Sequence, residues 1–212
     1  MKRIILWDHD GVLVDTEPLY FEATRSALAR LGVDLPLDGY LEDMAHGITA
    51  WERARRRGID EDRIRRHREA RDVHYQRLLS ERDIGIPGVE PVLAGLAGRY
   101  AMAIVTTARR ADFELIHAER QIVRHMDFVL ASGDYPRAKP APDPYLTALE
   151  RFGAEPAEAV VVEDSERGLR AAVAAGIDCV VVANDFVRGQ DFSRATARID
   201  RLDELPGVIA AL

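Results

Sequence analysis

An uninterrupted apolar run near the start of the chain ends abruptly in acidic residues and a glycine. Ile4–Trp7 holds four apolar residues without alternation, which is typical of a strand buried on both faces of a parallel sheet. Asp8, Asp10 and Gly11 follow almost directly. In an open parallel sheet, ligands bind beyond the carboxyl ends of the strands. Because side chains two residues apart share one face of an extended chain, Asp8 and Asp10 are predicted to reach the same hard cation or phosphate.

From residue 84 onward, short apolar strands alternate with helices. Helices of about 10 to 13 residues between such strands indicate right-handed crossovers and a doubly wound parallel sheet. The fold class expected is therefore α/β, with a Rossmann-like core. After the first strand, further strands are predicted over residues 101–105, 128–131, 159–162 and 179–183. Helices are predicted over residues 88–98, 111–123, 142–152, 166–175 and 202–212.

Residues 16–83 have no strand character and are predicted to form a small helical domain. Thr16 resembles a helix N-cap, and an arginine-rich helix is expected from Asp60 to about Arg82. Shorter helices are expected to end near Gly32 and to span residues 40–45 and 48–57. The chain is therefore predicted to consist of a catalytic core, residues 1–15 plus 84–212, with a helical insertion of residues 16–83.

Polar residues end three of the predicted strands at what would be one edge of the sheet. Besides Asp8 and Asp10, these are Thr106 and the pair Glu163 and Asp164. Clustered carboxylates repel one another unless a cation lies among them. Because no histidine or cysteine cluster accompanies them, the oxygen ligands favour Mg²⁺ over zinc.

Four segments together resemble the motifs of the haloacid dehalogenase superfamily of phosphotransferases. Trp7–Asp15 resembles the first motif, with Trp7 where the family usually has Phe. Val105-Thr106 resembles the second, Lys139–Leu146 the third and Val161–Ser165 the fourth. The motifs occur in the family's order and cover essentially the whole predicted core.

The resemblance implies a role for each polar group. Asp8 would be the nucleophile that forms an aspartyl phosphate, and Asp10 the general acid and then the general base. Thr106, Thr107 and Lys139 would bind the transferred phosphate. The implied cofactor is Mg²⁺, held by Asp8, the backbone carbonyl of Asp10, and Asp164, with Glu163 as a supporting residue or a further ligand.

The insertion between the first and second motifs resembles the C1 cap of the subgroup that contains β-phosphoglucomutase and phosphoglycolate phosphatase. Such a cap excludes bulk water and recognises the leaving group. Candidate recognition residues each have a structural alternative, such as helix capping or packing inside the cap. They are Thr16, Glu17, Tyr20, His46 and Trp51.

The function expected is hydrolysis of a small phosphorylated metabolite, such as a sugar phosphate, by a Mg²⁺-dependent phosphatase. A β-phosphoglucomutase-like isomerase is the alternative, but such mutases usually carry a Gly-Val-Ser-Arg cap segment, whereas this chain has His46–Ala50 without the arginine. Haloacid dehalogenases generally lack the carboxylate of Asp10. A non-catalytic binding module on the same fold would be expected to lose a motif residue, and none is lost.

The composition limits the kinds of binding partner and the cellular compartment that we expect for this protein. The net charge of −7 gives no support for nucleic-acid binding, and no apolar stretch approaches the roughly 20 residues that a membrane helix needs. Cys179 is the only cysteine and lies in an apolar run, which predicts a buried, inert thiol and no disulfide. We expect a cytoplasmic monomer or weak dimer whose partner is a small phosphorylated metabolite.

Residues 53–71 hold nine arginines against four acidic residues, a local charge of +5. Such a run is usually a solvated helix face. The alternative is that some of these arginines attract or bind an anionic substrate.

Overall fold

The computed structural model describes all 212 residues, which fall into two compact units. The core unit comprises Met1–Asp15 and Gly85–Leu212, and the helical unit comprises Thr16–Ile84. The second boundary lies one residue beyond the predicted end of the insertion.

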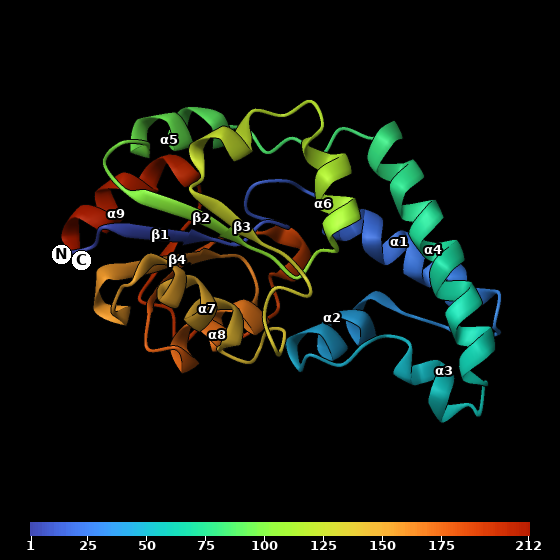
Figure 1. Ribbon diagram of the computed structural model, residues 1–212. Coiled ribbons are helices and arrows are strands. Elements are labelled where there is room, and N and C mark those ends of the chain that lie inside the picture. Colours follow the sequence, from blue (N-terminus) through green and yellow to red (C-terminus); the bar gives the residue numbers. More distant parts are fainter. The chain divides into compact units, whose positions relative to one another are not determined.

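The core unit is built on one parallel sheet of six strands in the order β3-β2-β1-β4-β5-β6 (Figure 1). Strands β2 and β3 are added in turn on one side of β1, and the chain then crosses to the other side of β1, where it forms β4, β5 and β6. The direction in which strands are added therefore reverses between β1 and β4. Ligands bind at such a reversal, beyond the carboxyl ends of the strands. The predicted doubly wound α/β fold is confirmed. The strands are β1 (Ile4–Trp7), β2 (Ala101–Val105), β3 (Phe128–Leu130), β4 (Ala159–Glu163), β5 (Asp178–Val182) and β6 (Ala197–Ile199).

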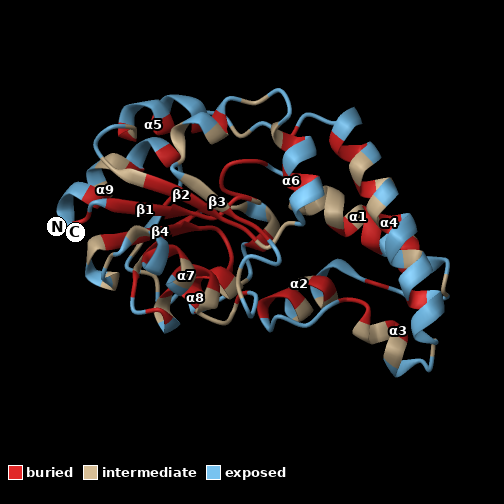
Figure 2. Cartoon of the chain, in the orientation of Figure 1, coloured by how far each residue is buried: buried red, intermediate tan, exposed pale blue.

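Helices cover both faces of this sheet, with α5 and α9 on one side and α7 and α8 on the other (Figure 1). The central strands are buried along their whole length, whereas the helices expose their outer faces (Figure 2). This burial explains why β1 and β4 are apolar without alternation. The core helices are α5 (Val89–Leu96), α6 (Arg110–His117), α7 (Asp143–Phe152), α8 (Glu166–Ala174) and α9 (Leu205–Ala211).

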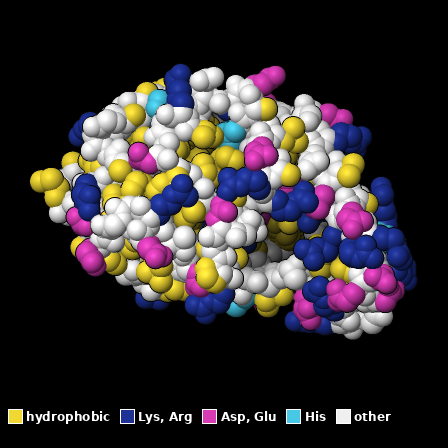
Figure 3. All heavy atoms as spheres, viewed as in Figure 1, with side chains coloured by type: hydrophobic (Ala, Val, Ile, Leu, Met, Phe, Trp, Pro, Cys, Tyr) yellow, Lys and Arg dark blue, Asp and Glu magenta, His cyan; other side chains and the backbone are white.

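The helical unit contains α1 (Glu17–Ala29), α2 (Leu37–Ala45), α3 (Glu52–Arg56) and α4 (Glu61–Glu81), and α1 packs along α4. Asp60 caps α4, because its carboxylate accepts a hydrogen bond from the backbone N–H of Arg63 at 2.9 Å. Arg65 pairs with Asp62 and Glu69 on the exposed side. Basic and acidic side chains intermingle over this unit (Figure 3), as expected for a solvated helix face. None of the chain's helices combines the length and the apolar character needed to cross a membrane.

Two predicted helices differ in the structure, and one strand of the structure was not predicted. The helix predicted over 111–123 ends at His117, where the side chain of Arg120 donates to the carbonyl oxygen of Ile116, and a separate 3₁₀ turn follows at Ile122–His125. The helix predicted over 48–57 is reduced to α3. The edge strand β6 was not predicted, because three residues with an exposed Arg198 at their centre are too short to show a strand pattern.

Candidate active site

Polar side chains from three neighbouring strands meet at the carboxyl edge of the sheet. Asp8 follows β1 and Thr106 follows β2, while Glu163 ends β4 and Asp164 comes directly after it. Because β1 pairs with both β2 and β4 in parallel, these ends lie side by side. The structure therefore brings together the strand-end residues that the sequence singled out.

Lys139, from the loop between β3 and α7, lies at the centre of this group. Its Nζ donates to Asp8 Oδ1 at 2.5 Å, to Glu163 Oε1 at 2.7 Å and to the carbonyl oxygen of Val105 at 2.9 Å. Burial acts to lower the pKa of Lys139, but the carboxylates of Asp8 and Glu163 outweigh it and raise that pKa. Lys139 is therefore a fixed positive charge at neutral pH.

Glu163 is held by donors on both of its oxygens. Besides Lys139, Oε1 accepts from the Tyr145 hydroxyl at 2.7 Å. Oε2 accepts from the Ser165 hydroxyl at 3.1 Å and from the backbone N–H groups of residues 164 and 165. Burial acts to raise the pKa of Glu163, but Lys139 and the Tyr145 hydroxyl outweigh it and lower that pKa, so the carboxylate stays ionised. This arrangement suits Glu163 to holding Lys139 in place.

Asp8 has an unusual protonation equilibrium. Burial raises its pKa most, followed by the negative charge of Glu163, and the pKa reaches about 7 although Lys139 acts to lower it. The site thus holds more negative charge than Lys139 alone compensates. A cation beside Asp8 would favour its ionised form.

Asp10 lies next to Thr106. The Thr106 hydroxyl donates to Asp10 Oδ2 at 3.2 Å and accepts the backbone N–H of Ala108 at 2.9 Å. The Tyr135 hydroxyl donates to the carbonyl oxygen of Thr106 at 2.7 Å. Thr107, the other predicted phosphate ligand, is half-buried, and its hydroxyl lies 3.5 Å from a guanidinium nitrogen of Arg167.

His9, between the two aspartates, points into the core rather than toward the edge of the sheet. Its side chain is fully buried, packs on Phe113, and brings Nε2 within 2.9 Å of Nε2 of His117. Burial lowers the pKa of His117 to about 3, so that imidazole is neutral at pH 7. Because side chains alternate along an extended chain and His9 points to one side, Asp8 and Asp10 lie together on the other side.

Three carboxylates could hold a cation together. Ligand oxygens of Asp8, Glu163 and Asp164 lie within 4.8 Å of one another, and all three residues are buried. An all-oxygen ligand set suits Mg²⁺. A Cβ on Gly11, whose φ is +84°, would lie 1.9 Å from Asp164 Oδ2, so a glycine is needed where this carboxylate meets the backbone. The carboxylate of Asp10 is not part of this group, and coordination by its backbone carbonyl stays a prediction.

The candidate recognition residues lie in the helical unit, where each has local contacts. Thr16 is buried at the N-cap position of α1, but its side chain makes no capping hydrogen bond. Glu17 accepts from the Tyr40 hydroxyl. Tyr20 packs edge-on against Tyr75 and beneath the guanidinium of Arg71. His46 is exposed, with Nδ1 2.8 Å from the carbonyl oxygen of Glu42, and Trp51 is buried. Substrate recognition by any of them stays a prediction.

Sequence reasoning missed three polar residues that support the site: Tyr135, Tyr145 and Asn184. Asn184 donates from Nδ2 to Asp164 Oδ2 at 2.7 Å. Asn184 follows β5 closely, as Thr106 follows β2. A polar residue in this position after an apolar strand could have been predicted from the sequence as a site residue. The two tyrosines come from a loop and a helix and carried no such signal.

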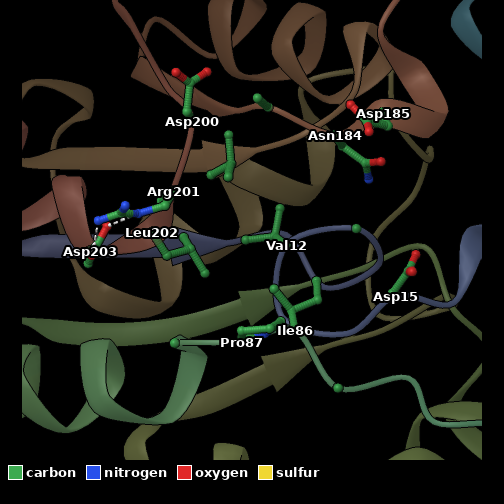
Figure 4. A pocket seen from close by; sticks show the side chains of 15 residues that line it. Val12, Asp15, Ile86, Pro87, Asn184, Asp185, Asp200, Arg201, Leu202 and Asp203 are labelled. Carbon is green, nitrogen blue, oxygen red and sulfur yellow. Dashed lines mark hydrogen bonds and ion pairs between the residues drawn. The ribbon is translucent and has the colours of Figure 1, made fainter.

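A cavity of about 630 Å³ lies beside the carboxylates in the core unit (Figure 4). Gly11, Val12 and Asn184 line it, together with residues 85–88 and 200–203. Its lining includes neither Asp8 nor Lys139, so it adjoins the cluster of catalytic candidates without containing it.

Comparisons with known proteins agree with these features. The sequence model described as haloacid dehalogenase-like hydrolase matches residues 5–182. "Protein CbbY" of Rhodobacter capsulatus is 31% identical over 217 residues, covering 94% of this chain and 93% of that protein. "Fructose-1-phosphate phosphatase YqaB" of Escherichia coli K12 is 30% identical over 186 residues, covering 84% and 95%.

One solved structure is similar to this chain in architecture as well as in sequence. The crystal structure of CbbY from Rhodobacter sphaeroides in complex with phosphate superposes with a TM-score of 0.79, at 29% identity, over 97% of this chain and 96% of that one. The family model spans the sheet from β1 to β5, with the motifs at its carboxyl edge. This chain therefore belongs to the haloacid dehalogenase-like hydrolase family.

Proposed function

We propose that this protein is a Mg²⁺-dependent phosphatase that hydrolyses a small phosphorylated metabolite through an acyl phosphate on Asp8. The observation that carries the proposal is the placement of Asp8. Its carboxylate is buried, lies 2.5 Å from the Lys139 ammonium and belongs to the group with Asp164. Such a carboxylate can act as a nucleophile while Lys139 binds the transferred oxygens.

The reaction divides into two steps that use the same pair of aspartates. Asp8 attacks phosphorus and forms the Asp8–phosphate bond, while the bond to the leaving oxygen breaks and that oxygen takes a proton from Asp10. Water then attacks the phosphorus of the acyl phosphate. Asp10 takes a proton from this water, and inorganic phosphate leaves with Asp8 regenerated. The Thr106 hydroxyl, 3.2 Å from Asp10 Oδ2, orients that carboxylate in both steps.

Asp8 and Asp164, whose carboxylate oxygens lie in one group, would hold the cation together with the backbone carbonyl of Asp10, which the resemblance to the family implies. Oxygen ligands of this kind suit Mg²⁺. Bound there, Mg²⁺ supplies positive charge that offsets the repulsion between the Asp8 carboxylate and the phosphate dianion. Glu163, which already accepts from Lys139, Tyr145 and Ser165, acts by positioning Lys139.

The substrate class proposed is a sugar phosphate. It rests on the similarity to a protein named for fructose 1-phosphate and to another named a phosphorylated carbohydrates phosphatase, from Thermotoga maritima. Hydrolysis is favoured over isomerisation because the cap segment His46–Ala50 lacks the arginine of the mutase segment.

The test is phosphate release from a panel of sugar phosphates and other small phosphomonoesters, with and without Mg²⁺. The variants are Asp8→Asn and, as a control with the same chemical change on an exposed carboxylate of the core unit, Asp200→Asn. We expect release that requires Mg²⁺, falls by several orders of magnitude in Asp8→Asn and is unchanged in Asp200→Asn.

Release that survives Asp8→Asn would contradict the proposed nucleophile. The panel includes β-glucose 1-phosphate with glucose 6-phosphate as a second readout. Isomerisation without phosphate release would identify a mutase, and no reaction with either readout would favour a binding module.

A further inference from the structure

Asn184 joins the end of β5 to the carboxylate of Asp164. Its Nδ2 donates to Asp164 Oδ2 at 2.7 Å, and its Oδ1 accepts the backbone N–H of Phe186 at 2.9 Å. A backbone N–H needs an acceptor, so the Phe186 contact fixes which end of the amide is the carbonyl. The NH₂ group is thereby directed at Asp164.

The pair formed by Asn184 and Asp164 packs directly on the backbone of the first motif. A Cβ on residue 11 would lie 1.9 Å from Asp164 Oδ2 and 2.7 Å from Asn184 Nδ2. Gly11 leaves that space open. The three segments after β1, β4 and β5 therefore meet at this single contact.

Asn184 also separates Asp164 from the neighbouring cavity. The side chain of Asn184 lies on the wall of that cavity (Figure 4), whereas Asp164 is 4% exposed and does not line it. Without the amide, water from the cavity could reach Asp164 Oδ2 and hydrate it in several orientations.

We propose that Asn184 is a positioning residue that fixes the Asp164 carboxylate in the orientation that binds Mg²⁺; this rests on the proposed function. A donor on Oδ2 prevents the carboxylate from rotating, so its orientation toward Asp8 is set before the ion arrives. The amide is neutral and leaves the full negative charge of Asp164 for the cation, whereas a lysine or arginine would compete with it. Groups that hold a metal ligand in this way contribute substantially to metal affinity.

The experiment measures Mg²⁺ binding to the full chain by titration calorimetry. It compares the wild type with Asn184→Ala and with Asn184→Leu, which keeps the branched shape of the side chain without the donor. Asp185→Ala is the control, because Asp185 is the adjacent exposed residue and pairs with Arg188 instead. We expect the Mg²⁺ dissociation constant to rise about tenfold in both Asn184 variants and to stay unchanged in the control.

Kinetics supply a readout that a purely structural role would not give. At saturating Mg²⁺ we expect the KM for the phosphorylated substrate to match the wild type, with the loss confined to the Mg²⁺ concentration needed for half-maximal rate. Equal Mg²⁺ affinity in the wild type and both variants would overturn the inference and leave the proposed function intact. Equal losses of melting temperature with and without Mg²⁺, at unchanged affinity, would also overturn it. A wild type that binds no Mg²⁺ would refute the metal site itself, and with it this role of Asn184.

Discussion

Lys139 is one of only two lysines in the chain, and its Nζ is buried between the carboxylates of Asp8 and Glu163. Replacing it removes the positive charge and leaves two carboxylates facing each other in a site with little water. We predict that Lys139→Met abolishes phosphate release and lowers the free energy of unfolding by about 3–5 kcal/mol, as measured by urea denaturation without metal.

Added Mg²⁺ should restore part of that stability, because it supplies the missing positive charge. The control is Lys2→Met. Lys2 is buried like Lys139, but its partner Asp178 is 43% exposed and stays hydrated after the change, so no carboxylate is left buried and unpaired and the loss should be smaller than in Lys139→Met. Losses of equal size in the two variants would argue against a special role for the buried carboxylates of the site.

Asp8 makes the metal-free protein less stable as the pH rises. Its pKa is raised to about 7, first by burial and then by Glu163, whereas an unfolded chain releases this proton near pH 4. Between these values the folded state binds more protons than the unfolded state, so the free energy of unfolding falls with increasing pH. We predict that, in EDTA, the wild type loses more stability than Asp8→Asn between about pH 5 and pH 8, as measured by urea denaturation. A parallel pH dependence in the two proteins would refute this.

The sequence could identify the residues that follow strands, because the change from an apolar run to Asp8 or to Glu163 shows where the strand ends. Lys139 was found through its motif alone, since a loop lysine has no pattern of its own. Tyr145 lies inside the segment that resembles the third motif, but the motif assigned it no role, and Tyr135 lies outside both kinds of segment. Their roles depend on how α7 and a loop pack against the sheet, which is a tertiary property that the local sequence does not encode.

Helix α8 packs against the end of β4 so closely that it constrains the site. A Cβ on Gly168 would lie 1.7 Å from Glu163 Oε1, which leaves no room for a side chain. We predict that Gly168→Ala lowers the free energy of unfolding by about 1–3 kcal/mol and reduces phosphate release, because Glu163 and with it Lys139 must move. Thermal unfolding and initial rates measure both effects.

Gly95 in α5 provides the matched control, because no atom lies within 4 Å of its added Cβ. Gly95→Ala should raise the free energy of unfolding by about 0.5–1 kcal/mol, since alanine loses less backbone entropy on folding. Destabilisation by both changes would show that helix context, rather than the contact with Glu163, decides the outcome.

Elements whose boundaries are marked in their own sequence were predicted closely, and those that depend on their neighbours were not. The long helix α4 has a cap, a buried stripe and exposed ion pairs in its own sequence. Strand β6 forms because its backbone pairs with strand β5 at the edge of the sheet, with Arg198 opposite Val181. The end of α6 at His117 has no glycine or proline to mark it.

The two units are joined through chain segments that lie next to each other in the core unit. Val14 and Gly85 form an antiparallel bridge, so the chain leaves for Thr16 and returns after Ile84 at neighbouring positions. Every catalytic candidate lies in the core unit, and every recognition candidate lies in the helical unit. An insertion with adjacent ends can often be removed without breaking the domain that carries it.

We therefore predict that replacing Thr16–Ile84 by a short Gly-Ser linker leaves a folded core that binds Mg²⁺. This variant should still hydrolyse a simple aryl phosphate, but the ratio of its kcat/KM values for two sugar phosphates should move toward one, because recognition residues are gone. Near-UV circular dichroism tests the fold, calorimetry tests Mg²⁺ binding, and the kcat/KM ratio tests recognition. An unfolded variant would show that the core depends on the helical unit. A folded variant with an unchanged ratio would place substrate specificity in the core itself, at the carboxyl edge of the sheet.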